Sequence, residues 1–384
     1  MEDSHASGFL SWVHFGDLHI GDAHDENYTD FLQLIDDVNG HLAGQVDFAF
    51  LPGDNADDGT EDQYKLVKSA LDRLKIPVHI IAGDHDKKGG NLDLFRQYLE
   101  PNPYRAVDVR GFRLLFLNAV EGAPAAFDLG SEQIQWTEAQ LMNARSAGLR
   151  PIVFTHLYPS QLATQAVTLS RFIRELNVEM VEMGHTHYNE LANDGSAIYA
   201  ATRSTGQVEE GAPGFSISTV DGDVVSWKFK ERGPWPFMMI TSPADERLIT
   251  RPGSPRHVLR DSVVIRARVW DGSASDPVLV TCSLDGETPR PMQFATGRWE
   301  FFWNTREVLD GTHQISVRAT HEGGEAQDEI SVRVSQAGRN TPPNRRAIDY
   351  ENAISAYPAK GVLGTQLGPN ENGTKGPWPS WRGR

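Results

Sequence analysis

The chain has 384 residues, with 36 Lys or Arg against 52 Asp or Glu, which gives a formal net charge of -16 at pH 7. That length exceeds one ordinary domain and favours two. The negative balance disfavours sequence-independent binding to long nucleic acid, because such binding needs clustered cations that face the phosphates. A small anionic substrate stays compatible with it, since bound divalent cations can dominate the field of a site.

Cysteine content and hydropathy narrow the class further. Cys282 is the single cysteine, so an intrachain disulfide and a zinc-thiolate cluster are excluded, and its apolar surroundings predict that it fills a core. No apolar run approaches the roughly 20 residues of a membrane span, which predicts no membrane association. The first ten residues, MEDSHASGFL, are acidic and lack the pattern of a signal peptide. We therefore expect a cytoplasmic protein, unless an export segment was trimmed from the chain, and its oligomeric state, including a homo-oligomer, stays open.

Residues 8–232 alternate short apolar runs with helical periodicity, a pattern typical of a layered α/β domain. Phe31, Leu34 and Ile35 share one helical face, and Val67, Ala70 and Leu71 share another. The segment closes with a predicted β-hairpin around Asp221-Gly222. The predicted buried strands before that hairpin are Leu10–Phe15, Phe48–Leu51, Val78–Ala82, Leu114–Leu117, Ile152–Thr155 and Met180–Met183.

Residues 236–335 lose the helical period. Val263, Ile265 and Ala267 alternate with polar or basic residues, and similar short runs follow with turn signals between them. This pattern predicts a smaller all-β domain, an Ig-like β-sandwich in its general architecture, although the Cys…Trp…Cys spacing of antibody domains is absent. Residues 336–384 are rich in Gly, Pro, Asn and Arg and predict an extended or partly disordered tail. A disordered end and an arm that lies back on the first domain both remain open.

Five of the apolar runs end in Asp or His, usually after a glycine. A single Gly-Asp is most often a turn. Five successive predicted strands that each end in Asp or His instead predict a metal site. Ligands of α/β sheets bind beyond the carboxyl ends of the strands, so these side chains are expected to converge on one rim. Carboxylate and imidazole together suit divalent Zn, Mn and Fe. The five clusters are Gly16-Asp17-Leu18-His19, Gly53-Asp54-Asn55-Ala56-Asp57, Gly83-Asp84-His85-Asp86, His156 and Gly184-His185-Thr186-His187.

Other polar residues receive a structural interpretation. His24 is the least secure of the remaining histidines, because it follows His19 closely and could line the mouth of the site. Arg203, Ser204 and Thr205 follow a predicted strand, and a structural turn is favoured for them over substrate contact. The histidines assigned to structure are His5, His14, His24, His41, His79, His257, His313 and His321.

The ordered motifs Asp-x-His, Gly-Asp-x-x-Asp, Gly-Asn-His-Asp/Glu, His and Gly-His-x-His resemble those of the calcineurin-like metallophosphoesterases. Over residues 8–232, the chain looks like their cyclic-nucleotide phosphodiesterase and glycerophosphodiesterase branch. The resemblance implies a four-layer α/β/β/α fold and two divalent metal ions (Mn, Fe or Zn). It also implies that Asp54 bridges both ions and that His85 is a non-ligand histidine, which helps to neutralise the phosphate and protonates the leaving group. The implied ligands are Asp17, His19 and His187 for the first metal, and Asp84, His156 and His185 for the second.

The chemistry of these residue types agrees with that role. Two cations that clamp a phosphate lower the pKa of a bridging water and generate hydroxide near neutral pH. The leaving alkoxide needs a proton, which an imidazole can donate. Asp57 and Asp86 are expected to orient ligands. The predicted function is hydrolysis of a small-molecule phosphodiester or phosphomonoester.

Asp84 stands where the family usually has Asn. It adds a negative charge and removes an amide donor, so we expect tighter metal binding and weaker binding of an anionic substrate. A purple acid phosphatase is disfavoured, since such enzymes use a tyrosine ligand in the second motif and usually lack the first histidine, whereas this chain has Asp57 and His19. Mre-type nucleases share most motifs, but the net charge argues against one. The alternative function is a metal-bound, weakly active scaffold or partner-binding protein.

Overall fold

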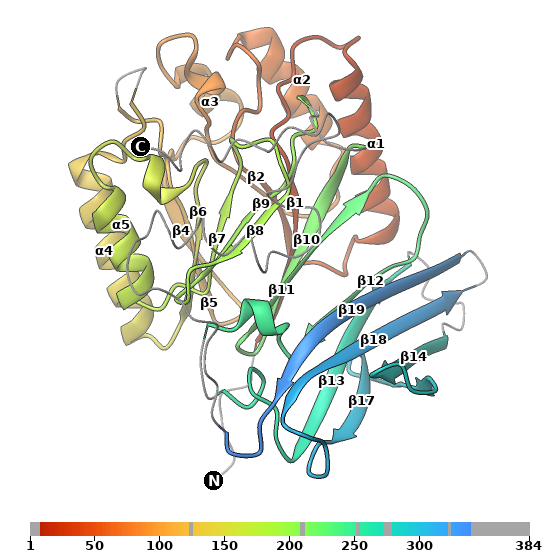
Figure 1. Ribbon diagram of the computed structural model, residues 1–384. Helices are drawn as coiled ribbons and strands as arrows, with labels where there is room; N and C mark the ends of the chain where they lie inside the picture. The colour runs from red at the N-terminus through yellow and green to blue at the C-terminus, as the bar shows by residue number, and fades with distance from the viewer. Residues whose placement is uncertain are drawn as a thin grey trace, which may run out of the picture.

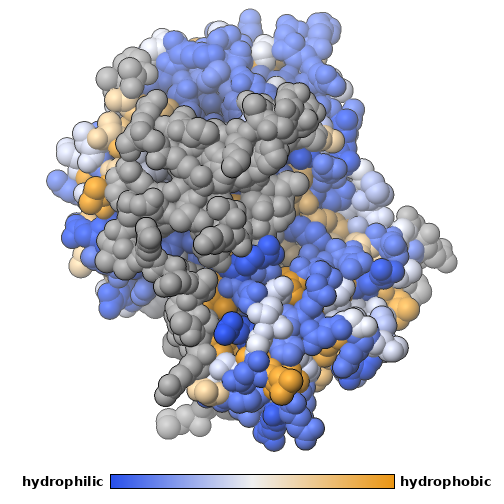
Figure 2. All heavy atoms as spheres, in the orientation of Figure 1, coloured by the Kyte–Doolittle hydropathy of each residue, from blue (hydrophilic) through white to orange (hydrophobic). Residues whose placement is uncertain are grey.

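A computed structural model of the chain describes residues 8–122, 126–207, 212–250, 254–271, 279–321 and 324–338. Figure 1 shows an α/β part, whose helices flank its strands on two sides, and an all-β part beside it. On the face drawn in Figure 2, the described surface is mostly hydrophilic, with its apolar residues scattered. Among the described residues, no helix combines the length and apolar character needed to cross a membrane.

Two β-sheets face each other inside the α/β part. Strands β1, β2 and β3 pair in parallel, while β10 pairs antiparallel with β1 and β11 antiparallel with β10. The first sheet has the order β11(Val224–Glu231), β10(Gly214–Asp221), β1(Phe9–Phe15), β2(Phe48–Leu51), β3(Val78–Ile80). The second has the order β4(Arg105–Val109), β5(Phe112–Phe116), β6(Arg150–Phe154), β7(Met180–Met183), β9(Ile198–Ala201), β8(Glu190–Asn193).

Helices cover the outer face of each sheet, so the layers run helix, sheet, sheet, helix (Figure 1). The inner core joins the sheets, with Trp12 of β1 stacked on Phe48 of β2 and edge-on to Phe154 of β6. Because both faces of β1 are covered, its residues are nearly all buried, as expected for a strand in such a layer. The helices are α1(Glu26–His41), α2(Glu61–Leu71), α3(Asp93–Tyr98), α4(Gly130–Ser146) and α5(Ala166–Glu175), with 3-10 turns η1(His85–Lys87), η2(Pro159–Gln161) and η3(Glu246–Leu248).

The all-β part consists of two four-stranded sheets, which fit a β-rich second domain. Its core includes Cys282, which is 1% exposed, in agreement with the prediction from the sequence. One sheet has the order β12(Phe237–Ser242), β13(Ser262–Trp270), β17(Arg298–Asn304), β16(Gln293–Ala295). The other has the order β15(Arg290–Pro291), β14(Leu279–Leu284), β18(Gly311–His321), β19(Gly324–Val334). Residues 339–384 of the predicted tail lie outside the described residues.

Asp221, at the turn between β10 and β11, ties the two parts together. Its buried carboxylate lies 2.9 Å from Arg298, 3.3 Å from Arg266 and 3.5 Å from Arg256, three arginines supplied by the all-β part and the segment that leads to it. We call these three residues the arginine cluster. A buried carboxylate shared by three guanidinium groups fixes the orientation of one part on the other.

Candidate metal centre

The five predicted clusters follow β1, β2, β3, β6 and β7, at the carboxyl ends of parallel strands. The structure brings all seven predicted ligands together there, in two groups that share Asp54. In each group, one possible ligand atom per residue lies within 4.8 Å of those of the other members. The first group is Asp17, His19, Asp54 and His187, and the second is Asp54, Asp84, His156 and His185.

The first group holds two imidazoles against two carboxylates. The Nε2 atoms of His19 and His187 are 3.1 Å apart, and the Nε2 atom of His187 lies 3.5 Å from Oδ2 of Asp17. Oδ2 of Asp54 is 3.7 Å from Nε2 of His19. Oδ1 of Asp17 is buried and has no hydrogen-bond partner. Lone pairs that converge in a buried space without a donor between them suit a cation.

The second group is built around His156. Its Nδ1 atom lies 2.8 Å from the carbonyl oxygen of Pro52, which can only accept a hydrogen bond, so Nδ1 carries the proton and Nε2 keeps a lone pair in the neutral ring. That Nε2 atom is 3.1 Å from Oδ1 of Asp84 and 3.5 Å from Oδ1 of Asp54. Nδ1 of His185 lies 3.3 Å from the same oxygen of Asp84. Because the two oxygens of Asp54 face different groups, this side chain has the geometry of a bridging ligand.

The imidazoles of the centre differ in pKa, because Asp54, although burial opposes it, raises the pKa of His156 well above its usual value, whereas two other imidazoles are kept neutral. Burial lowers the pKa of His19 and, together with the neighbouring His19, lowers that of His187 to about 3. Neutral imidazole is the form that binds metals. Burial raises the pKa of Asp17. Burial alone would also raise the pKa of Asp54, but its contacts with His156 lower that pKa to about 2.

Glycines let the loops approach closely enough to form these groups. A Cβ atom on Gly83 would lie 2.1 Å from Oδ1 of Asp54, and one on Gly53, which has φ 114°, would lie 2.5 Å from Nδ1 of His156. Only glycine fits at these two positions. The loop after β1 is fixed from the opposite side, since the backbone N–H of His185 donates to Oδ2 of Asp17 at 2.7 Å.

His85 lies at the edge of the first group and shares a carboxylate with it. Oδ1 of Asp57 is 3.1 Å from Nδ1 of His85 and 3.2 Å from Nδ1 of His19, and the backbone N–H of His85 donates to Oδ1 of Asp54 at 2.8 Å. Asp57 thus contacts both His85 and a candidate ligand. The carboxylate of Asp86 accepts hydrogen bonds from backbone N–H groups, including that of Gly83 at 2.9 Å, and so holds the loops that carry Asp54 and Asp84.

The other residues that received a structural interpretation make structural contacts. His14 is buried and bonded to Glu182 at 2.5 Å, and His24 is exposed. The guanidinium of Arg203 stacks over the Phe229 ring and pairs with Glu231 at 2.8 Å, as a structural residue would. The hydroxyl of Ser204 donates to the carbonyl oxygen of Asp17 at 2.8 Å, so this turn supports the first group from behind.

Sequence reasoning missed two neighbours of the centre. The ring of Phe127 lies edge-on to that of His185, with centroids 5.1 Å apart. The amide nitrogen of Gln207 lies 3.4 Å from Nδ1 of His19. Both come from loops without a motif, so no pattern in the sequence could have placed them.

Comparison with known proteins agrees with this geometry. Residues 11–189 match the calcineurin-like phosphoesterase family (Metallophos). This match supports a calcineurin-like metallophosphoesterase domain in this part of the chain, and with it a hydrolase.

The chain is similar to several curated proteins and to a solved structure. A glycerophosphodiester phosphodiesterase of Enterobacter lignolyticus is 30% identical over 165 residues, which cover 38% of this chain and 57% of that protein. A probable cyclic nucleotide phosphodiesterase of Fibrobacter succinogenes is 22% identical, over 56% of this chain and 90% of its own length. A probable glycerophosphodiester phosphodiesterase of Arcobacter nitrofigilis is 24% identical, and the match covers 39% of this chain and 53% of that protein, about half. A dimetal phosphatase structure from Danio rerio has a TM-score of 0.48 at 14% identity, covering 58% of this chain and 96% of that one.

Proposed function

We propose that this protein is a binuclear metal-dependent phosphoesterase that hydrolyses a small-molecule phosphodiester. The observation that carries the proposal is the pair of four-residue groups that share Asp54. Carboxylate and neutral imidazole in such sets suit Mn, Fe or Zn. When bound, two such ions supply Lewis acidity toward phosphate oxygens and hydroxide at neutral pH.

The protein's own residues supply position and a proton. Asp17, His19 and His187 are proposed to hold one ion, and Asp84, His156 and His185 the other. His85 is proposed to assist the leaving group, because its side chain is 22% exposed and is oriented by Asp57. An imidazole with one nitrogen held and the other free is suited to proton donation.

A diester is favoured over a monoester because the curated relatives carry phosphodiesterase names. Asp84 supports the same preference, since an added carboxylate at the phosphate side opposes a dianionic monoester more than a monoanionic diester. We further propose the domain bounds 8–232 and 236–335, with an Ig-like sandwich as the second domain. The second candidate function, a weakly active scaffold, also rests on Asp84 in the position that is usually Asn.

Hydrolysis of bis-p-nitrophenyl phosphate and of p-nitrophenyl phosphate tests the proposal. The full chain is treated with a chelator and reloaded with Mn or Zn, and metal content is measured in the same samples. We expect diester cleavage that disappears on chelation, returns on reloading and falls by about 10²–10⁴-fold in His85→Ala. His24→Ala, which removes an exposed histidine outside the groups, should keep full activity. Two bound metals without cleavage of either ester would support the scaffold instead.

A further inference from the structure

Glu182 places a carboxylate in the inner core between the two sheets of the α/β part. The residue belongs to β7 and is 0% exposed. Its partner in the register with β6 is Phe154, a member of the apolar cluster that joins the sheets. A carboxylate in such a layer costs free energy unless hydrogen-bond donors satisfy it. The donors that Glu182 finds are therefore informative.

Three side chains of the opposite sheet hold this carboxylate. The indole N–H of Trp12 donates to Oε1 at 3.0 Å, the hydroxyl of Ser218 donates to the same oxygen at 2.5 Å, and Nδ1 of His14 lies 2.5 Å from Oε2. Trp12 and His14 belong to β1 and Ser218 belongs to β10. Each of these contacts therefore crosses from the second sheet to the first. We call Glu182 and its three partners the cross-sheet clamp.

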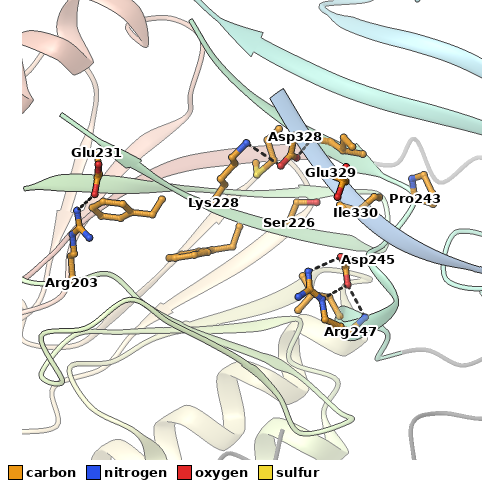
Figure 3. Close-up of a pocket in the computed structure, with 15 residues that line it drawn as sticks. Arg203, Ser226, Lys228, Glu231, Pro243, Asp245, Arg247, Asp328, Glu329 and Ile330 are labelled. Carbon is orange, nitrogen blue, oxygen red and sulfur yellow. Dashed lines mark hydrogen bonds and ion pairs between the residues drawn. The ribbon is translucent and has the colours of Figure 1, made fainter. Parts of the chain in front are cut away.

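Stability alone does not account for the clamp. Nε2 of His14 is buried and has no hydrogen-bond partner among the described residues, so the network is incompletely satisfied. Within the described part of the chain, no Lys or Arg pairs with Glu182, whereas Asp328 pairs with Lys228 at 3.0 Å in the cavity between β11 and the all-β part (Figure 3). Apolar side chains of similar volume often stabilise a core as well as a buried polar pair does. Directional hydrogen bonds, in contrast, define the relative position of the two sheets.

That relative position matters because each metal group takes its ligands from both sheets. In the first group, three ligands from the first sheet meet one from the second, and in the second group two meet two. A shift between the sheets changes the ligand separations of both groups, and it affects the evenly divided second group most. The loops of the first sheet carry Asp17, His19, Asp54 and Asp84, and those of the second carry His156, His185 and His187.

The backbone connects Glu182 to the ligand loops over a short path. Its carbonyl oxygen accepts from the N–H of Thr155, the residue before His156, at 3.0 Å. At the rim, the N–H of His185 donates to Oδ2 of Asp17 at 2.7 Å, which joins β7 and β1 a second time. The same two strands are thus tied at two levels, one in the core and one at the metal centre. In a close-packed interior, a change at the lower level reaches the upper one.

We propose that Glu182 is a positioning residue of the metal centre, whose clamp sets the distance between the ligands of the first sheet and those of the second. This inference rests on the proposed function, because its effect is measured on metal binding. Loosening the clamp should weaken binding in the second group more than in the first. A residue that only stabilised the fold would not discriminate between the two groups.

Binding of Mn²⁺ to the metal-free full chain tests the proposal, by competition with a chromogenic chelator well below the unfolding temperature. His187→Ala isolates the second group, and His185→Ala isolates the first. In these backgrounds, Glu182→Gln replaces one acceptor oxygen by a donor. It should weaken Mn²⁺ binding about tenfold in the second group and about threefold or less in the first. Ser218→Ala removes one donor and should weaken the second group about threefold.

Two controls separate position from stability. Met180→Ala, two residues earlier on β7 and in the same inner core, lowers the free energy of unfolding through a cavity. It should change Mn²⁺ affinity by no more than about twofold. Thr219→Ala matches Ser218→Ala, since it removes the next hydroxyl on β10, which is buried and has no hydrogen-bond partner among the described residues. It should leave Mn²⁺ affinity unchanged.

Equal losses of affinity in Glu182→Gln and Met180→Ala would overturn the proposal, as would a larger loss in the first group than in the second. If Glu182→Gln does not fold, the comparison of Ser218→Ala with Thr219→Ala decides, and equal affinities in these two variants overturn the clamp. A wild type that binds two Mn²⁺ ions but cleaves neither ester removes the proposed function and keeps the clamp. A wild type that binds no Mn²⁺ overturns both.

Discussion

Asp84→Asn tests the electrostatics of the second group most directly. Oδ1 of Asp84 lies 3.1 Å from Nε2 of His156 and 3.3 Å from Nδ1 of His185. Although burial opposes it, these two histidines hold the pKa of Asp84 below its usual range. The carboxylate is therefore charged at any working pH, and the substitution removes one full negative charge while it keeps an oxygen that can bind a metal.

The size of the effect follows from exposure and distance. Two unit charges about 4 Å apart interact by about 4 kcal/mol at an effective dielectric constant of 20. The Asp84 side chain is 39% exposed, so about half of that value is appropriate. We expect Asp84→Asn to weaken metal retention by about 2 kcal/mol, or about thirtyfold. An anionic diester farther away should gain about 1 kcal/mol, which lowers KM about fivefold.

The assay measures both quantities in one protein. Metal affinity is obtained by competition with a chromogenic chelator, and KM for bis-p-nitrophenyl phosphate is measured at saturating metal. Asp62→Asn, at an exposed position in the first turn of α2, controls for the loss of one charge from the molecule. Unchanged metal affinity and unchanged KM would refute the reasoning, as would a KM that rises when the charge is removed.

Two further predictions concern stability. Burial and, to a lesser extent, Arg105 lower the pKa of His79 to about 4. Below about pH 6.5 the unfolded chain binds a proton at this residue that the folded chain does not bind. The free energy of unfolding is therefore full above pH 6.5 and decreases as the pH falls toward 4. In urea unfolding, His79→Gln should therefore lose about 2 kcal/mol less relative to the wild type at pH 5 than at pH 7.5, and a difference that does not depend on pH would contradict this. Asp221→Asn leaves the arginine cluster without its buried counter-charge and should lower the free energy of unfolding by about 3 kcal/mol. A loss below about 1 kcal/mol, similar to that of the exposed Asp58→Asn, would show that the contacts of Asp221 with the cluster do not hold the two parts together.

The sequence predicted the strands that carry the centre because their signals are local and strong. Phe48–Leu51 and Met180–Met183 are apolar runs whose observed bounds equal the predicted ones. Strand β3 was predicted over Val78–Ala82 but ends at Ile80, because the chain already turns toward the loop of Asp84. An apolar run that stops at Gly and Asp marks both the end of a strand and the start of a loop, and so it reports fold and site together.

Helices and strands that bury polar residues could not be predicted from apolar runs. Strand β8(Glu190–Asn193) is fully buried although half of it is polar, since Tyr158 donates to Glu190 at 2.5 Å and Asn193 donates to two backbone carbonyls. Helix α4(Gly130–Ser146) buries Gln133, whose amide bonds the backbone of Asn118 in both directions. Tertiary hydrogen bonds make these residues buried, and a single sequence does not show which polar groups will find partners.

Backbone conformation adds an argument for the centre that the motifs alone do not contain. Among the described residues other than glycine, nine have positive φ, and four of them are candidate ligands: His19, Asp54, His185 and His187, with φ between 45° and 68°. Several of the others have a local explanation, since Arg110, Asp285 and Thr296 each precede a glycine in a strand turn. The four candidate ligands do not precede a glycine, and a residue other than glycine in the left-handed region costs free energy that the fold must offset. Because strained backbone conformations persist where geometry is selected over stability, the gathering of these four at one rim supports a site built to hold its ligand atoms at fixed positions before any ion binds.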